Sequence, residues 1–221
     1  MTQDTIANIL RTVSDLRGES AVNEDAVRIR ACSNTEQDFA RRRMWTVHLL
    51  RNQTIAGDGT NDYEIGSANY PMRLKGLSEV FVGGQTEDKR VIVVNYFDYQ
   101  EVINADSTAR VAYEYYDAAN DKWMVHINPA PATGETIYYS YFYMPVKKTL
   151  TTEYIVCPNL MYIVKTVMAY LADGDDETER AMELRQEAEL AFQEMNILED
   201  MTAINMETSF KKQTSRGIGT Y

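Results

Sequence analysis

The stretch 109–144, ARVAYEYYDAANDKWMVHINPAPATGETIYYSYFYM, decides the fold class. Two aromatic and β-branched runs, 109–117 and 123–127, flank the polar turn AANDK, a pattern typical of a β-hairpin. A third aromatic run, 136–144, follows the loop NPAPATG. Closely spaced runs of this kind predict an antiparallel sheet or a small barrel.

Further β signals precede this stretch. The segment 54–66, TIAGDGTNDYEIG, places a Gly-Asp-Gly turn between short β-favouring runs. Residues 77–82 lead into a Gly-Gly pair, and residues 91–99, VIVVNYFDY, are strongly β-branched and aromatic. We therefore expect a β-rich part that covers residues 51–149.

Helical patterns lie on both sides of the β-rich part. A second helix of the chain is expected from Asn23, a suitable N-terminal cap. The first ends near Gly18, where a helix-terminating glycine belongs. The apolar residues that recur at helical spacing in the first helix are Ile6, Ile9, Leu10, Val13 and Leu16.

After residue 150 the pattern becomes helical again. Pro158 suits the first turn of a helix that runs to about Ala172, because its missing N–H costs nothing there. Asp175 and Asp176 then begin a helix whose acidic first turn matches the helix dipole. The apolar face of this helix comprises Ala181, Leu184, Ala188, Ala191, Phe192, Met195 and Leu198.

The order of these parts predicts an α+β protein. A terminal α-helical bundle is expected from residues 1–50 and 150–200, with an antiparallel β domain of residues 51–149 inserted in it. Residues 201–221 show no apolar periodicity and predict an extended C-terminal arm.

Charge is distributed unevenly along the chain. The formal net charge is −11, and residues 173–200 carry eleven acidic residues against Arg180 and Arg185. A protein that grips DNA needs basic stripes to displace counterions, so this chain would repel DNA. For the acidic group Asp175, Asp176, Glu177 and Glu179 two interpretations stay open: a solvated face, which charge runs usually are, or a channel wall that faces DNA without binding it.

The residue types that carry enzyme chemistry are scarce. The chain has two His and two Cys residues, which is too few for the usual histidine metal sites, and Cys32 and Cys157 are expected to be buried, reduced thiols. The run from Asp58 to Asp62 resembles a calcium loop, but its twelfth position is Asn69 rather than Glu. No P-loop or dinucleotide motif follows a strand. We therefore expect no catalytic residue, no metal and no cofactor, and no enzymatic activity.

Neither a membrane span nor a secretory leader is expected. No run approaches the roughly 20 apolar residues that span a bilayer, and the start MTQDTIANIL lacks the basic and apolar parts of a signal peptide. The sequence thus predicts synthesis in the cytoplasm as a soluble protein; a host cytoplasm is implied only by the resemblance given next.

The order of segments resembles that of the head–tail adaptor (gatekeeper, or tail tubular protein A-like) proteins of tailed bacteriophages. Four stretches carry the resemblance, and none of them is catalytic. They are DAVRIRACSNTEQDFARRRMWTVHLL (25–50), QTIAGDGTNDYEIGSANYPMRLKGLSEVFV (53–82), the hairpin YEYYD…DKWMVHINPAP, and CPNLMYIVKTVMAYLADGDDETERAMELRQEAEL (157–190).

This resemblance implies a structural virion protein in the head–tail connector region. Subunits of such a family form a ring, typically of twelve, between the portal protein and the tail nozzle or tail-tube protein, and DNA passes through the channel without specific binding. The arm would embrace the portal. On this sequence the implied portal-binding residues are Phe210, Lys211, Lys212, Arg216 and Tyr221.

Other functions remain as alternatives. The chain would also suit another tail or nozzle structural protein. A carbohydrate-binding β module would use Trp123, Tyr115, Tyr139 and Tyr141 as a stacking platform. A hydrolase is the third alternative and would need a deep pocket with a perturbed carboxylate.

Overall fold

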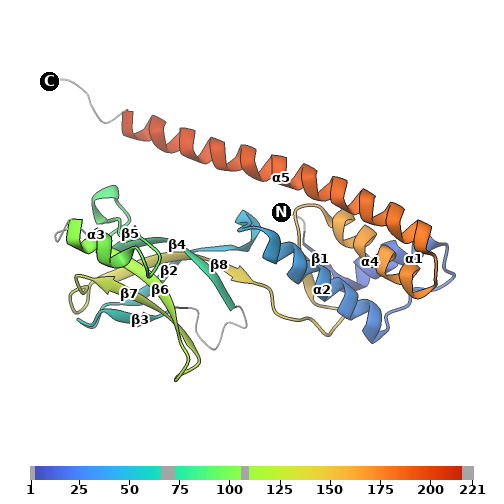
Figure 1. The fold of residues 1–221 in the computed structure, drawn as a ribbon, viewed down its shortest axis with the longest axis horizontal. Coiled ribbons are helices and arrows are strands. Elements are labelled where there is room, and N and C mark those ends of the chain that lie inside the picture. The colour runs from blue at the N-terminus through green and yellow to red at the C-terminus, as the bar shows by residue number, and fades with distance from the viewer. Residues whose placement is uncertain (1–2, 66–72, 106–109, 216–221) are drawn as a thin grey trace. The chain divides into compact units, whose positions relative to one another are not determined.

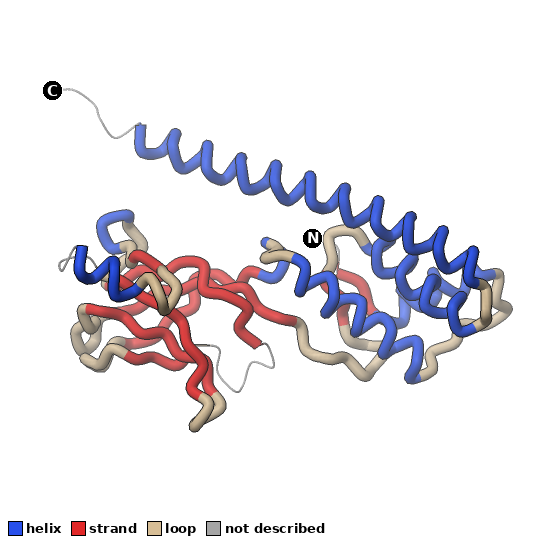
Figure 2. Tube along the Cα trace, viewed as in Figure 1, coloured by secondary structure: helices blue, strands red, loops and turns tan. Residues whose placement is uncertain are grey.

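Two compact units divide the chain. The computed structural model describes residues 3–65, 73–105 and 110–215. A helical unit is formed by Met1–Phe39 and Lys147–Tyr221, and a β unit by Ala40–Val146. Figure 2 shows the two larger groups of strands gathered in the β unit and the long helices in the rest of the chain. The predicted α+β fold class is confirmed, and the β unit begins at residue 40 rather than 51.

The helical unit is built from four helices and one small sheet (Figure 1). Its elements are β1 (Gln3–Thr5), α1 (Ile6–Arg17), α2 (Ala26–Arg42, whose last three residues belong to the β unit), β9 (Tyr154–Val156), α4 (Leu160–Gly174) and α5 (Thr178–Ser215). Strands β1 and β9 pair antiparallel. Helix α4 packs against both α1 and α5.

The helix ends follow ordinary capping chemistry. Gly18 ends α1 with a φ of 69°, a left-handed conformation that glycine adopts without strain. The cap of α2 is Asp25, whose carboxylate accepts a 2.8 Å hydrogen bond from the Arg28 amide. The expectation of a cap at Asn23 is wrong, because that side chain instead accepts from the Asp25 amide at 3.1 Å.

The turn between α4 and α5 differs from the prediction by a few residues. Asn159 caps α4, so Pro158 lies just before the helix rather than in its first turn. Helix α5 begins at Thr178, and Asp176 lies in the turn with a φ of 61°. Asp175 and Asp176 therefore belong to the connection, and Glu179 supplies the acidic group of the first turn.

Helix α5 is much longer than the sequence suggested. It continues through residues 201–215, so the prediction of an extended arm is wrong for these residues. The physical reason is that no Gly or Pro stands between Thr178 and Gly217, and nothing in the backbone chemistry ends the helix earlier. Residues 216–221 lie outside the described part of the chain.

An aromatic triangle lies in the core of the helical unit. The ring of Phe39 is 5.9 Å from that of Tyr162 and 6.5 Å from that of Phe192, and these last two rings are 5.8 Å apart. Small residues on the buried face of α5, Ala181 and Ala188, allow α5 to lie close to α4. The other buried apolar residues of the helices include Ile6, Ile9, Leu10, Val13, Ile163, Val164, Val167, Leu184 and Met195.

The β unit holds two sheets. Its elements are η1 (Thr46–His48), β2 (Leu49–Ala56), β3 (Asp62–Glu64), β4 (Arg73–Val82), η2 (Glu87–Lys89), β5 (Ile92–Val93), α3 (Tyr99–Ala105), β6 (Val111–Asp117), β7 (Lys122–Asn128) and β8 (Thr136–Met144). One sheet has the order β2-β8-β4 and the other the order β3-β7-β6-β5. Among the described strands both sheets stay open, so the small barrel is not formed.

Alternation along the strands explains the core of the β unit. Inward-facing residues from both sheets form one cluster, in which Ile137, Val80 and Ile127 are fully buried. The predicted hairpin is confirmed as β6–β7, with Tyr116 opposite Trp123. Its turn is fixed by Asp117, whose carboxylate accepts hydrogen bonds from the Ala119 amide and the Asn120 side chain.

The segment 91–99 departs most from the expected strand. Only Ile92–Val93 pair with β6, and they run parallel to it, which makes this the one parallel pair among the described strands. Beyond them Asn95 folds the chain into a turn, and helix α3 begins at Tyr99. Of the three aromatic residues in this segment, only Tyr99 is buried, whereas Tyr96 and Phe97 are exposed.

Candidate functional site

The two cysteines are structural. Cys32 and Cys157 are free and buried, as predicted. Burial raises the pKa of each thiol to about 12, so both stay protonated at neutral pH. The Sγ atom of Cys157 lies 3.7 Å from the Sδ atom of Met195, inside the packed helical core.

The described residues offer no metal centre. Within residues 3–65, 73–105 and 110–215, no group of three His, Cys, Asp or Glu side chains is arranged to hold a metal ion. The calcium-like run forms a turn instead, because the Asp58 carboxylate accepts hydrogen bonds from the amide and the hydroxyl of Thr60. In the same part of the chain, no helix combines the length and apolarity that crossing a membrane requires.

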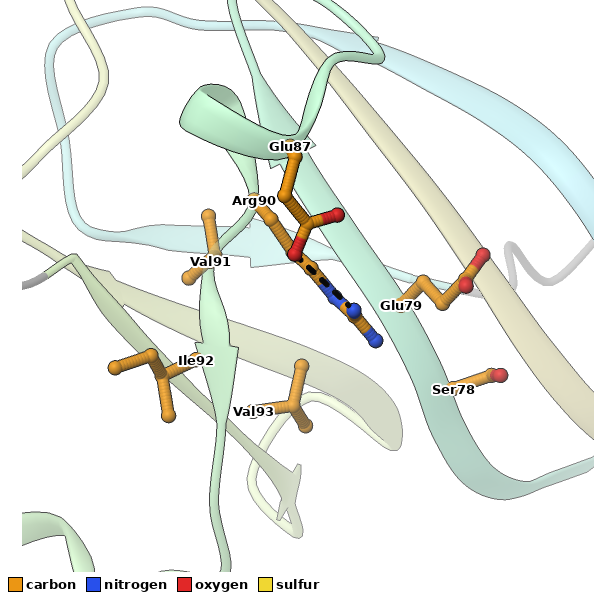
Figure 3. A pocket seen from close by; sticks show the side chains of 7 residues that line it. All are labelled: Ser78, Glu79, Glu87, Arg90, Val91, Ile92 and Val93. Atoms are coloured by element: carbon orange, nitrogen blue, oxygen red, sulfur yellow. Dashed lines mark ion pairs between the residues drawn. The ribbon is translucent and has the colours of Figure 1, made fainter. Parts of the chain in front are cut away.

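A hollow of the β unit is shown in Figure 3. It has a volume of about 540 Å³ and lies between strand β4 and the segment that leads into β5. Glu87 and Arg90 form an ion pair across it at 3.6 Å, and the lining is completed by Ser78, Glu79, Val91, Ile92 and Val93. These seven described residues include no His or Cys, so the hollow holds no nucleophile paired with an imidazole base.

The predicted carbohydrate platform does not exist. Tyr139 and Tyr141 lie on β8 and are buried in the core of the β unit, with their rings stacked on each other at 5.9 Å. Trp123 and Tyr115 lie on the other sheet. A sugar cannot stack on Tyr139 and Tyr141, which the core covers, so the four residues do not form one common platform.

The acidic group predicted from sequence gathers at the turn between α4 and α5. Asp176, Glu177, Glu179 and Glu183 line an open hollow there. Asp175 instead forms a 2.6 Å ion pair with Arg17 of α1, so it fastens the turn to the bundle. The structure thus brings three of the four predicted acidic residues together on an exposed surface.

The predicted arm residues lie at the far end of α5 or beyond it. Phe210, Lys211 and Lys212 belong to the helix, and Arg216 and Tyr221 lie outside the described residues. Phe210, Lys211 and Lys212 thus belong to a helical extension rather than to an extended segment.

A second apolar face of α5 was missed by sequence reasoning. The residues that pack inward include Leu184, Ala188 and Met195. Leu190, Ile197 and Met201 are spaced by seven and four residues, which places them together on another side of the helix. They are 61%, 61% and 57% exposed. The signal that could have found them is this second apolar repeat, which is hidden among the acidic residues of the helix.

Glu36 and Lys148 form a buried ion pair close in sequence to the two points where the chain passes from one unit to the other. Glu36 on α2 is fully buried and forms an ion pair with Lys148. Its other carboxylate oxygen accepts a 2.7 Å hydrogen bond from the Val156 amide, and the Ser33 hydroxyl accepts one from the Lys148 amide at 2.8 Å. The charge is therefore satisfied on several sides, which a buried carboxylate requires.

A lysine closes the end of α2 within the β unit. The ammonium group of Lys75, on β4, donates hydrogen bonds to the backbone carbonyls of Ala40 and Arg43. These carbonyls belong to the last turn of α2 and its exit, where a positive charge is favourable. Partial burial lowers the pKa of Lys75.

The described residues thus combine a buried ion pair with a long helix that carries a second, exposed apolar face. The family model of the SU10 adaptor protein matches residues 4–209, nearly the whole chain. The chain belongs to this family and is a structural adaptor protein of bacteriophage virions. No curated protein matches the sequence.

Proposed function

We propose that this adaptor is one subunit of a ring that joins the portal protein of the filled head to the tail. The proposal follows the gatekeeper and tail tubular protein A-like proteins, which the order of segments resembles and in which twelve subunits are typical. The helical unit makes the contacts between subunits and with the portal. The β unit meets the tail nozzle or tail-tube protein, and DNA passes through the central channel without specific binding.

The observation that carries this proposal is the exposed apolar face of α5. Three large apolar side chains that share one face of a helix mark a contact with another protein. A ring needs two different surfaces that fit each other, so this face of one subunit meets another surface of the next subunit. Glu194 stands between Leu190 and Ile197 on the same side of the helix, so two copies of this face would bring like charges together and do not pair directly.

The acidic group at the α4–α5 turn has a role in the same proposal. Asp176, Glu177 and Glu179 face the channel, where a negative wall keeps DNA from sticking during ejection. Residues 201–221 dock on the portal, with Lys211 and Lys212 directed to acidic portal surface.

Mass photometry and negative-stain imaging test the ring. The chain alone is expected to be monomeric and to form rings when mixed with its portal. The double variant Leu190→Glu/Ile197→Glu should abolish these rings, because it places charge in an apolar contact. Leu16→Glu is the matched control, since Leu16 is 51% exposed on α1 and lies outside the α5 face. Unchanged rings in the double variant would refute the proposed contact.

A further inference from the structure

Two adjacent aromatic side chains of the β unit stand out in solvent. Tyr96 is 62% exposed and Phe97 is 85% exposed, the highest value among the exposed large apolar residues of the described chain. Both lie in the connection between β5 and α3. Aromatic residues are enriched at protein interfaces, and a large exposed aromatic pair marks a candidate contact surface.

The loop that carries this pair, the aromatic tip (Tyr96 and Phe97), is fixed by local hydrogen bonds. The side-chain oxygen of Asn95 accepts from the amides of Phe97 at 2.9 Å and of Asp98 at 3.0 Å. The side-chain amide of Asn95 donates to the Asp98 carboxylate at 2.5 Å. The backbone carbonyl of Asp98 then accepts from the Val102 amide in α3. The tip is therefore held in place before any partner arrives, which reduces the entropy lost on binding.

A cluster of packed aromatic rings supports the aromatic tip. Tyr96 packs edge-on against Tyr113, with ring centres 5.3 Å apart, and Tyr113 contacts Tyr99 at 4.6 Å and His126 at 5.0 Å. The His126 ring of this cluster is held by a 2.8 Å hydrogen bond between its Nδ1 atom and the Asp62 carboxylate. The tip thus stands on the two strands of the confirmed hairpin rather than on a free loop.

We propose that the aromatic tip inserts into an apolar pocket, with a basic rim, on another protein of the virion on the tail side of the adaptor. This inference rests on the proposed function and names the residues of its tail-side contact. Asp98 and Glu101 lie beside the tip without a basic residue in the segment 95–101, and this negative charge favours a basic rim on the partner.

The geometry disfavours other occupants. The rings of Tyr96 and Phe97 meet at 77°, so they form no flat platform for a sugar or a nucleobase. The acidic neighbours Asp98 and Glu101 repel nucleic acid. A second copy of this chain offers the hollow of Figure 3, but there Arg90 is paired with Glu87 and Glu79 adds a further negative charge, which would face the acidic neighbours of the tip.

The test uses the full-length chain and the other structural proteins of the same virion, each purified and immobilised separately for biolayer interferometry. The wild-type chain should bind one of them besides the portal. Phe97→Ser should weaken this binding at least about 30-fold, as expected for a central aromatic anchor, and Tyr96→Ser should weaken it as well. Tyr170→Ser is the matched control, because Tyr170 is 55% exposed but lies on α4 of the helical unit.

The possible outcomes distinguish the role of the aromatic tip from the proposed adaptor function. Unchanged affinity of Phe97→Ser for a tail-side protein would refute the role of the tip and leave the adaptor function standing. Absence of any binding by the wild-type chain would refute both. Self-association that Phe97→Ser abolishes would assign the tip to a contact between copies and overturn the inference. Equal unfolding midpoints of all variants show that the exposed substitutions leave the fold intact.

Discussion

The carboxylate of Glu36 on α2 forms an ion pair with the ammonium group of Lys148, although the two residues are 112 positions apart in the chain. Glu36 is fully buried, whereas the Lys148 side chain keeps 12% of its surface exposed. The pair joins the helix that leads into the β unit to the segment that returns from it. Burial raises the pKa of Glu36, and the positive charge of Lys148 opposes this shift.

The first prediction concerns Lys148, whose positive charge neutralises the buried carboxylate of Glu36. Lys148→Met is expected to reduce the free energy of unfolding by about 3–5 kcal/mol at pH 7, because an ionised carboxylate remains buried without its counter-charge. The loss should shrink as the pH falls and Glu36 binds a proton, since the neutral acid needs no counter-charge. Urea unfolding at several pH values measures both effects.

The double variant Glu36→Gln/Lys148→Met is the control for this experiment. It should recover most of the lost stability at pH 7, because no charge is left in the core. An equal loss in the single and the double variant would show that the packing of the lysine chain matters, and not its charge.

A second prediction concerns acid unfolding of the helical unit. Glu19 accepts hydrogen bonds from Arg28, Ser14 and Arg17, and the guanidinium of Arg28 is the main cause that lowers the Glu19 pKa to about 2. The stabilisation is thus present above about pH 4.5 and is lost as the pH falls towards 2. The difference in unfolding free energy between wild type and Glu19→Gln should shrink over this range.

Ser14→Ala serves as the graded comparison for Glu19. It removes one hydrogen bond from the carboxylate and leaves both arginines in place, so its effect on the acid range should be smaller. Parallel pH curves for wild type and Glu19→Gln would contradict the role of the Arg28 pair.

The third prediction concerns the end of α2. Lys75→Met should reduce the stability of the β unit by about 1–3 kcal/mol, since two carbonyls lose a charged hydrogen-bond donor. Lys75→Arg keeps the positive charge and should lose less. Hydrogen exchange of the amides near Ala40 and Arg43 locates the effect, and faster exchange confined to other strands would refute it.

The fourth prediction concerns the far end of α5. Removal of residues 202–221 should abolish docking on the portal, because the residues proposed for that contact are deleted. The midpoint of urea unfolding should change little, since the inward-packing residues Leu184, Ala188 and Met195 all precede the cut. Docking that survives the truncation would refute the portal role of this segment.

The strands were the most predictable part of the fold. The runs 111–117 and 136–144 alternate and are rich in Tyr, Ile and Val, and they form β6 and β8 with bounds close to those expected. Local chemistry was enough there because each strand packs one face on the core. The segment 91–99 misled the prediction, because a single side chain, that of Asn95, turns the chain before a strand can extend.

The parts that escaped prediction depend on distant partners. The neighbours of Glu36 in the sequence do not indicate that Lys148, 112 positions away, neutralises it. The burial of this charged residue could therefore not be recognised from the pattern of its helix. The length of α5 escaped for a different reason. Its last turns lack apolar periodicity, and periodicity was the signal used, whereas the absence of Gly and Pro was the better guide.

The β unit is one uninterrupted segment, Ala40–Val146, so the chain passes between the units only twice. An exchange of genetic material between related viruses would then have to preserve only two connections, one after Phe39 and one before Lys147. The whole segment can thus be exchanged in one step for the corresponding segment of a related protein. Under the proposed function, such an exchange would let a phage acquire a new tail while the helical unit, proposed to face the head, stays the same.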